Sequence, residues 1–233
     1  MKSIYRVIAI WSCWLVLNSL ARAQEGSSSK SFVTLVNVAT AGSDRLHMKV
    51  NGKTIYEPGY SAGQYTGCMV FDSGTLKVEL VKEGCFPAER TLSLAAGKTT
   101  TLIVYAEEIF EKDTESSLGF QLRLATLPQK TVSDGVGASF VSFLLNEEVS
   151  LKVKDLVSKT EIRKVLNPLK REDVLLSGGG ETRAQVSVGG QYVGSIKTKT
   201  NGNRVAILWR DEKEKLRLIN FYDAAYSVSE KGN

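Results

Sequence analysis

The chain has 233 residues, with 30 basic and 25 acidic side chains and a net charge of +5. Part of this charge lies at the N-terminus: removing Lys2, Arg6 and Arg22 leaves 27 basic residues against 25 acidic ones, and the net charge falls to +2. So small an excess argues against a nucleic-acid-binding protein. Beyond the N-terminal segment, no stretch is apolar enough to cross a membrane.

The N-terminal segment has the three parts of a signal peptide. Lys2 and Arg6 precede an apolar run from Val7 to Leu20, and Ala21-Arg22-Ala23 supplies the small residues of a cleavage site. The run of about 14 residues is shorter than the roughly 20 that a permanent membrane helix needs. We therefore predict a cleaved signal peptide over residues 1–23 and a periplasmic or secreted protein, with an uncleaved N-terminal anchor as the alternative.

Removal of the signal peptide leaves two of the three cysteines, Cys68 and Cys85. In an oxidising compartment such a pair predicts a disulfide that closes a short loop and stabilises the fold by about 3 kcal/mol. Two buried free thiols are the alternative. The remaining length fits one large β domain or two domains of about 100 residues each.

In chain order, the small polar residues 24–30 predict a disordered leader, after which apolar and polar residues alternate. Leu46, Met48 and Val50, for example, fall on one face of a strand, as expected for a half-buried strand. Asn51-Gly52 predicts a hairpin, and Asp72-Ser73-Gly74 predicts another between the strands on either side of it. The predicted strands of the first half are 32–37, 45–50, 53–56, 65–71, 75–81, 91–94, 99–105 and 118–125.

The second half repeats the order of the first. Residues 127–138 contain proline, serine and glycine and predict a linker, after which Ser139–Asn146 resembles Ser31–Asn37. Further strands are predicted at 184–188, 192–197, 204–209 and 216–221, and the repeat spacing is about 108 residues. Residues 155–169 fit either a helix or a strand with a loop. We predict an all-β protein with two tandem antiparallel β-sandwich domains, 31–126 and 139–228.

The chemistry-bearing residues do not predict an enzyme. The single histidine, His47, lies between two cations on the polar face of a strand. Any catalytic triad would have to use this histidine. One histidine, with Cys68 and Cys85 paired to each other, is also too few ligands for the usual zinc sites. Adjacent acids such as Glu147-Glu148 point to opposite faces of a strand. We therefore predict no catalytic residue, no metal and no cofactor. A glycosidase with two carboxylates distant in sequence is the remaining enzymatic alternative.

One loop is a candidate binding surface. Tyr56, Tyr60 and Tyr65 lie among small residues in a segment whose shape Pro58 and Gly59 set. Tyrosines on such a loop offer contact area to sugars or proteins at little entropic cost. The alternative is that Tyr65 and Tyr56 are core residues.

The order of turns and strands resembles a widespread secreted bacterial β-sandwich domain. The best single element is Leu92-Ser93-Leu94-Ala95-Ala96-Gly97-Lys98, followed by the strand Thr101–Val104. The tandem form behind a signal peptide is similar to the periplasmic adaptor proteins of alginate O-acetylation. The likeness covers most of residues 31–226, but the second half has Thr200-Asn201-Gly202-Asn203 at the matching turn, and the two cysteines also depart from the adaptor pattern.

The resemblance implies a non-catalytic periplasmic scaffold. Such a protein would hold an acetyltransferase complex of the envelope together during O-acetylation of an exported polysaccharide, and would reach the membrane only through its partners. Two joined domains would bind partners multivalently, and exposed sheet edges would accept an added strand. The alternative is a secreted cell-surface module that contacts glycan or protein through its loops.

Overall fold

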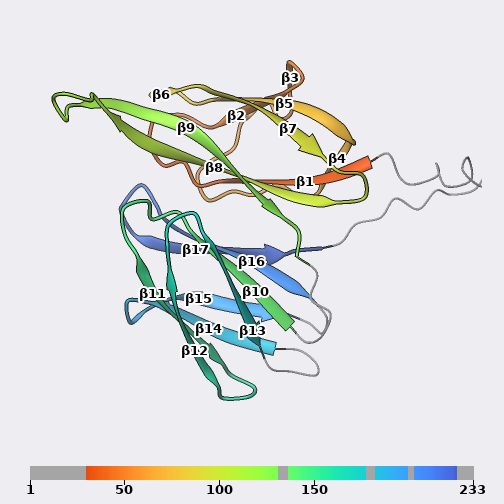
Figure 1. Cartoon of the computed structure of the whole chain (residues 1–233), viewed down its shortest axis with the longest axis vertical. Coiled ribbons are helices and arrows are strands. Elements are labelled where there is room, and N and C mark those ends of the chain that lie inside the picture. Colours follow the sequence, from red (N-terminus) through yellow and green to blue (C-terminus); the bar gives the residue numbers. More distant parts are fainter. Residues whose placement is uncertain (1–29, 131–135, 177–181, 199–201, 225–233) are drawn as a thin grey trace, which may run out of the picture.

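The computed structural model describes residues 30–130, 136–176, 182–198 and 202–224. Within these ranges the chain forms strands and turns but no helix, so the predicted all-β class is confirmed. It follows that no described helix could cross a membrane. Figure 1 shows two sandwiches stacked on each other. The predicted signal peptide and residues 24–29 of the leader lie outside the described residues.

The first sandwich consists of β1 (Lys30–Asn37), β2 (His47–Val50), β3 (Lys53–Thr54), β4 (Met69–Asp72), β5 (Gly74–Val81), β6 (Cys85–Phe86), β7 (Ala88–Leu94), β8 (Thr99–Phe110) and β9 (Ser117–Pro128). A five-stranded sheet in the order β4-β1-β8-β9-β6 faces a four-stranded sheet in the order β3-β2-β5-β7. The alternating apolar residues of both sheets meet between them and form a first core, which includes Leu35, Met48, Val78, Leu102 and Leu122.

The second sandwich consists of β10 (Val136–Ser142), β11 (Val149–Asp155), β12 (Glu161–Leu166), β13 (Arg171–Leu176), β14 (Thr182–Val188), β15 (Gln191–Thr198), β16 (Asn203–Arg210) and β17 (Leu216–Tyr222). Its sheets have the orders β13-β10-β16-β17 and β12-β11-β14-β15. A second core lies between them and includes Phe140, Leu151, Leu166, Val186 and Leu208. The segment 155–169 contains the strand β12, so the strand interpretation holds there.

The two sandwiches share one topology. The parallel pair β1–β8 at the centre of the first corresponds to the parallel pair β10–β16 of the second. The hairpin β8–β9 corresponds to β16–β17, and the strands β2, β5 and β7 correspond to β11, β14 and β15. Apart from β6, which has no counterpart in the second sandwich, the strand order is the same in both, as a tandem duplication would produce.

The hydrogen bonds correct the register that the sequence repeat indicated. Val38 N–H donates to Val104 O, and Phe143 N–H donates to Leu208 O at the same point of the second sandwich, both at 2.8 Å. Leu35 therefore corresponds to Phe140. The sequence repeat had instead aligned Phe32 with Phe140. That alignment differs from the structural one by an odd number of residues, so it assigns each side chain to the wrong face of the strand.

The predicted hairpin at Asp72-Ser73-Gly74 is wrong. β4 pairs with β1, whereas β5 pairs with β2 and β7, so this turn carries the chain from one sheet to the other. The segment joining the sandwiches is also shorter than the predicted linker 127–138. β9 extends through Pro128 and β10 begins at Val136.

The predicted disulfide between Cys68 and Cys85 is also wrong, because both cysteines are free. Cys68 precedes β4 and Cys85 begins β6, at opposite edges of the five-stranded sheet. Four strand spacings of about 4.8 Å separate these edges by roughly 19 Å. A disulfide requires Cα atoms within about 7 Å. The nearest acceptors are backbone oxygens, with Cys85 Sγ lying 3.4 Å from Ala41 O.

We expect iodoacetamide to alkylate both Cys68 and Cys85 when the protein is denatured without reductant. Mass spectrometry of the intact protein measures this. In the folded protein alkylation is expected to be slower, because burial raises the pKa of both Cys68 and Cys85 and only thiolates react. A mass that rises only after reduction would show that the two cysteines are bridged.

Candidate functional site

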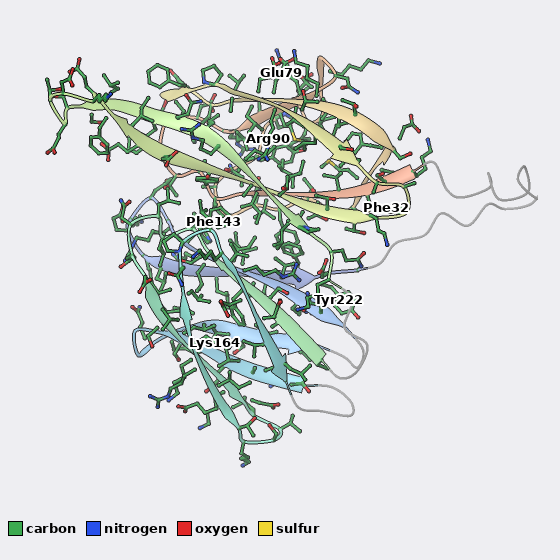
Figure 2. The ribbon with its side chains drawn as sticks, viewed as in Figure 1. Phe32, Glu79, Arg90, Phe143, Lys164 and Tyr222 are labelled. Carbon is green, nitrogen blue, oxygen red and sulfur yellow. The ribbon has the colours of Figure 1, made fainter. Side chains whose placement is uncertain are left out.

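The two sandwiches are joined by a third apolar core, which we call the junction core. It lies between the five-stranded sheet and the β13-β10-β16-β17 sheet, the two inner layers of Figure 1. Phe143, labelled in Figure 2, lies between the sandwiches and packs on Tyr105 with ring centroids 5.2 Å apart. The buried residues of the junction core are Val36, Val38, Ile103, Leu127, Val141, Phe143, Val205, Ile207, Trp209, Ile219 and Phe221.

The junction core explains why the central strands are buried on both faces. Every residue from Ser31 to Asn37 is buried, and so is every residue of β10. In β1 one set of alternate side chains fills the first core while the other set faces the junction. The domains therefore meet through an apolar interface of the kind that fixes relative orientation.

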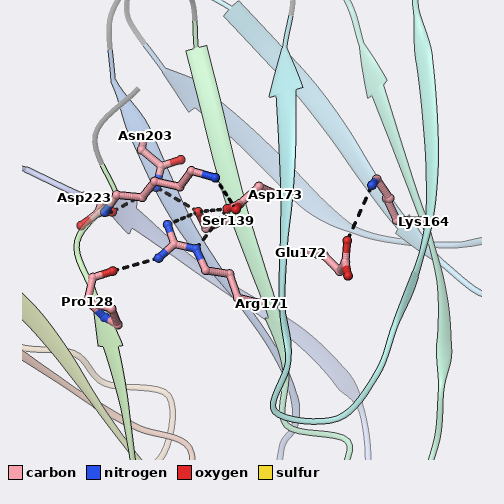
Figure 3. Close-up of polar contacts among 9 residues, drawn as sticks. Pro128, Ser139, Lys164, Arg171, Glu172, Asp173, Asn203 and Asp223 are labelled. Carbon is pink, nitrogen blue, oxygen red and sulfur yellow. Dashed lines mark hydrogen bonds and ion pairs between the residues drawn. The ribbon is translucent and has the colours of Figure 1, made fainter. Parts of the chain in front are cut away.

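A polar cluster closes one end of the junction (Figure 3). The Oγ of buried Ser139 donates to Asp173 (2.6 Å) and accepts from Arg171 (2.6 Å) and from Asn203 (3.0 Å). Arg171 also donates to Pro128 O of the first sandwich, at 2.8 Å. All hydrogen-bonding positions of the serine are thereby occupied. Ser139 ties strands together and has no lone pair left to act as a nucleophile.

The cluster also anchors the segment that leaves β9. Lys130 Nζ pairs with Asp173, and its backbone N–H donates to Asp223, at 3.0 Å. Asp223 in turn accepts from Asn203 Nδ2, at 3.0 Å. The strand β13 and the C-terminal end of the second sandwich are thus both bonded to the segment that joins the domains.

Asp173→Asn is expected to lower the free energy of unfolding by about 1–2 kcal/mol near neutral pH. Burial alone would raise the pKa of Asp173 above its usual 3.8, but the hydrogen bonds from Lys130, Ser139 and Arg171 outweigh it, and the pKa is lowered. The stabilisation is therefore present above about pH 4 and is lost as the pH falls through the folded-state pKa.

Urea midpoints measured near neutral pH and near pH 3 test this expectation, because protonated aspartate and asparagine become similar. The loss should be largest near neutral pH and shrink in acid. Asp72→Asn is the matched control, since the Asp72 side chain is 80% exposed and its one ion pair among the described residues is with Lys30. An equal loss at both pH values would contradict the role assigned to the carboxylate.

A groove opens at the opposite end of the junction. One cavity of about 430 Å³ is lined by both sandwiches, with Tyr105 and Ala106 from β8 and Phe143, Trp209 and Glu147 from the second sandwich. A second cavity of about 520 Å³ continues from it along the end of the second sandwich. Both cavities share the lining residues Leu144, Glu147, Arg210 and Glu214, so we treat them as one junction groove.

The junction groove combines apolar and charged lining residues. Arg210 pairs with Glu147 at 2.6 Å and with Glu214 at 4.0 Å. Burial, with a smaller contribution from Glu107, raises the pKa of Tyr105, so its hydroxyl stays protonated and can donate a hydrogen bond. Such a surface suits a protein or peptide that presents apolar and polar groups together.

The groove is held in place by the tyrosine-containing loop. Trp209 is 6% exposed, and its indole Nε1 is buried without a hydrogen-bond partner. Gly63 lies against this ring with φ +83, and a Cβ at that position would be 2.8 Å from Trp209 Cζ2. Only glycine fits this close approach. The sequence placed Trp209 in a core, and the structure shows that the core is the one between the domains.

The three predicted binding tyrosines do not form one surface. Tyr60 is 9% exposed and belongs to the first core, which leaves little of its ring on the surface. Tyr56 is exposed and packs on Tyr60, with ring centroids 5.3 Å apart. Tyr65 is 49% exposed and stacks on Phe221 of the second sandwich at 5.1 Å. Tyr65 therefore belongs to the junction, on a different part of the molecule from Tyr56.

The sequence missed the groove because its residues come from segments far apart in the chain. In the sequence, Glu147 was visible only as part of an acidic pair and Tyr105 only as the end of a predicted strand, while Arg210 lay outside the predicted strand 204–209. Among the described residues no three histidine, cysteine or acidic side chains gather as a metal site. Comparison with known proteins assigns no family: no family model matches the chain, and no curated protein matches it either.

Proposed function

We propose that this protein acts outside the cytoplasm as a non-catalytic adaptor that holds envelope proteins together. The observation that carries the proposal is the junction core. Because it locks two sandwiches into a single body, surfaces from both domains keep a constant geometry. A partner that binds such a preformed surface does not have to order it first.

The junction groove is the surface that best fits this role. One of its two cavities is lined by both sandwiches, so that part of the groove exists only while the domains are docked. Its aromatic and apolar residues beside paired charges suit a protein–protein contact, whose apolar core is surrounded by a polar rim. Partner binding and domain docking are therefore coupled, because a partner in the groove stabilises the docked arrangement.

Within this role we propose O-acetylation of an exported polysaccharide as the setting, with an acetyltransferase complex as the partner. Support for this finer statement comes from the sequence resemblance, above all the turn Leu92–Lys98, and from the tandem arrangement of two sandwiches. An adaptor of this kind works by bringing a membrane-bound donor system next to the enzyme that uses it.

Site-specific cross-linking in the producing cell tests the proposal. A photoreactive residue replaces Asn146, which is exposed and lines the junction groove, and in a control it replaces Val165, which is 54% exposed on β12. Cross-linked proteins are identified by mass spectrometry. We expect an acetyltransferase or acyl-transfer membrane protein at position 146 and not at 165. The same products from both positions, or none from 146, would contradict the proposal.

A second candidate function, a secreted module that grips glycan through its loops, is favoured by one observation. Tyr65 and Tyr222 are both more than 40% exposed, and the guanidinium of Arg204 lies 5.7 Å from the Tyr222 ring centroid. No acidic side chain of the described residues pairs with Arg204. Polysaccharide binding that is lost in Tyr65→Ala but retained in Tyr56→Ala would support this function over the adaptor.

A further inference from the structure

The outer edge of β8 is open beyond the end of β1. β1 pairs with β8 from Phe32 to Asn37, which leaves β8 without a neighbour on that side after Val104. On its other side β8 pairs with β9 as far as Phe110. The unpaired stretch begins at the junction groove, whose lining includes Tyr105 and Ala106.

The hydrogen bonds show which backbone groups face this edge. Val104 O accepts from Val38 N–H on the β1 side, whereas Thr99 O accepts from Gln129 N–H on the β9 side. Backbone groups alternate in direction along a strand. The even-numbered residues Ala106 and Glu108 therefore turn both N–H and C=O outward. No strand of the described residues pairs with these groups.

The opposite edge of the same sheet is protected. There, β9 continues past the short strand β6. In this part of β9, Arg90 donates a hydrogen bond to Leu124 O, and Gln121 Nε2 donates to Leu122 O at 3.3 Å. These side chains occupy carbonyls that an added strand would need, which is how proteins block unwanted pairing. The described residues provide no such donor for Ala106 O or Glu108 O. Within one sheet, then, one edge is blocked and the other is available.

Charge and apolar area around the open edge select the kind of strand that would pair there. Residues 107–117, at the end of the β8–β9 hairpin, contain five acids and one lysine. Phe110, Leu118 and Phe120 are exposed on the same hairpin end. A second copy of this chain would place acid against acid, which is unfavourable for directly opposed residues. A strand with basic and apolar residues would find complementary neighbours on both faces.

We infer that a basic, extended segment of a partner protein adds to β8 as an extra strand, paired with Ala106 and Glu108. The inference rests on the proposed adaptor function and identifies how a partner would be gripped. Main-chain hydrogen bonds to the two residues supply affinity, and the acids of the hairpin supply the preference for lysine or arginine. The strand would run from the junction groove towards the hairpin end.

The test uses the mature protein and a capped peptide of about six residues that alternates lysine and valine. Binding is measured by isothermal titration and by amide shifts of Ala106 and Glu108 in NMR spectra. Glu108→Pro removes one outward N–H and leaves the ladder to β9 intact, so we expect binding about tenfold weaker. Glu108→Gln is the matched variant that keeps the N–H, and we expect at most about a threefold loss.

Two further probes separate strand pairing from simple charge attraction. A peptide N-methylated on alternate residues keeps its charge and loses its outward donors, so it should not bind. A glutamate–valine peptide should not bind either. Equal binding of the N-methylated peptide, equal affinity of the two Glu108 variants, or no binding by the lysine–valine peptide would overturn the inference. If cross-linking at position 146 still captures its partner in those cases, the adaptor proposal survives without the edge site.

Discussion

Ile207→Asp is expected to separate the two sandwiches without unfolding either of them. Ile207 is fully buried in the junction core and contributes to neither sandwich core. A carboxylate held there without a partner costs about 3–5 kcal/mol while the domains are docked. The charge reaches water as soon as they part, so separation is the cheaper response.

Calorimetry and small-angle X-ray scattering measure this result. We expect a single unfolding transition in the parent protein to divide into two in the variant, with a larger radius of gyration before the first. Leu175→Asp is the control, because Leu175 is 64% exposed on the same sheet and should change the unfolding free energy by no more than about 0.5 kcal/mol. A variant that stays compact with one transition would show that the junction core does not hold the domains together.

Phe140→Ala is expected to lower the unfolding free energy of the second sandwich by about 3–5 kcal/mol. Phe140 is fully buried and fills the second core between its two sheets. Truncation removes the transfer energy of the ring and leaves a cavity that close-packed neighbours cannot fill. For a domain of this size the loss corresponds to a fall in the melting temperature of about 15 °C or more.

Thermal denaturation followed by the fluorescence of Trp209 measures this effect, since the tryptophan lies on β16 of the same sandwich. Phe110→Ala is the matched control. Phe110 is 55% exposed, so the same truncation there should cost little. Equal shifts in both variants would contradict the assignment of Phe140 to the core.

The faces of the strands could be predicted from the sequence because burial on one side of a sheet imposes a period of two. Leu46, Met48 and Val50 were placed on one inward face, and all three are buried. The turn at Asn51-Gly52 was also predictable, since both residues adopt positive φ, 49° and 78°. These features depend on neighbouring residues alone.

The partners of the strands could not be predicted in the same way. A turn such as Asp72–Gly74 reverses the chain whether the next strand pairs with the last one or crosses to the other sheet. Whether the chain stays in one sheet or crosses to the other at this turn also decides how far Cys68 lies from Cys85. The predicted disulfide was therefore wrong for the same reason as the predicted hairpin. Local sequence describes a turn but not the sheet that receives the next strand.

The junction core did leave a signal in the sequence. In Phe32–Val36 only Thr34 interrupts the apolar residues, and a nearly continuous apolar run is typical of a strand covered on both faces. The structure buries this run between the first core and the junction. The groove beside it needed three distant segments to be placed together, which no local pattern encodes.

The parallel pairing at the centre of each sandwich has a consequence for how the chain folds as it emerges during synthesis. β1 needs β8, and β10 needs β16, before either central strand has its parallel neighbour. Contacts between residues so far apart in the chain close slowly. A chain that emerges N-terminus first would therefore present the apolar strand β1 to water until β8 has followed it, and during that interval it is exposed to aggregation and to binding by holding chaperones.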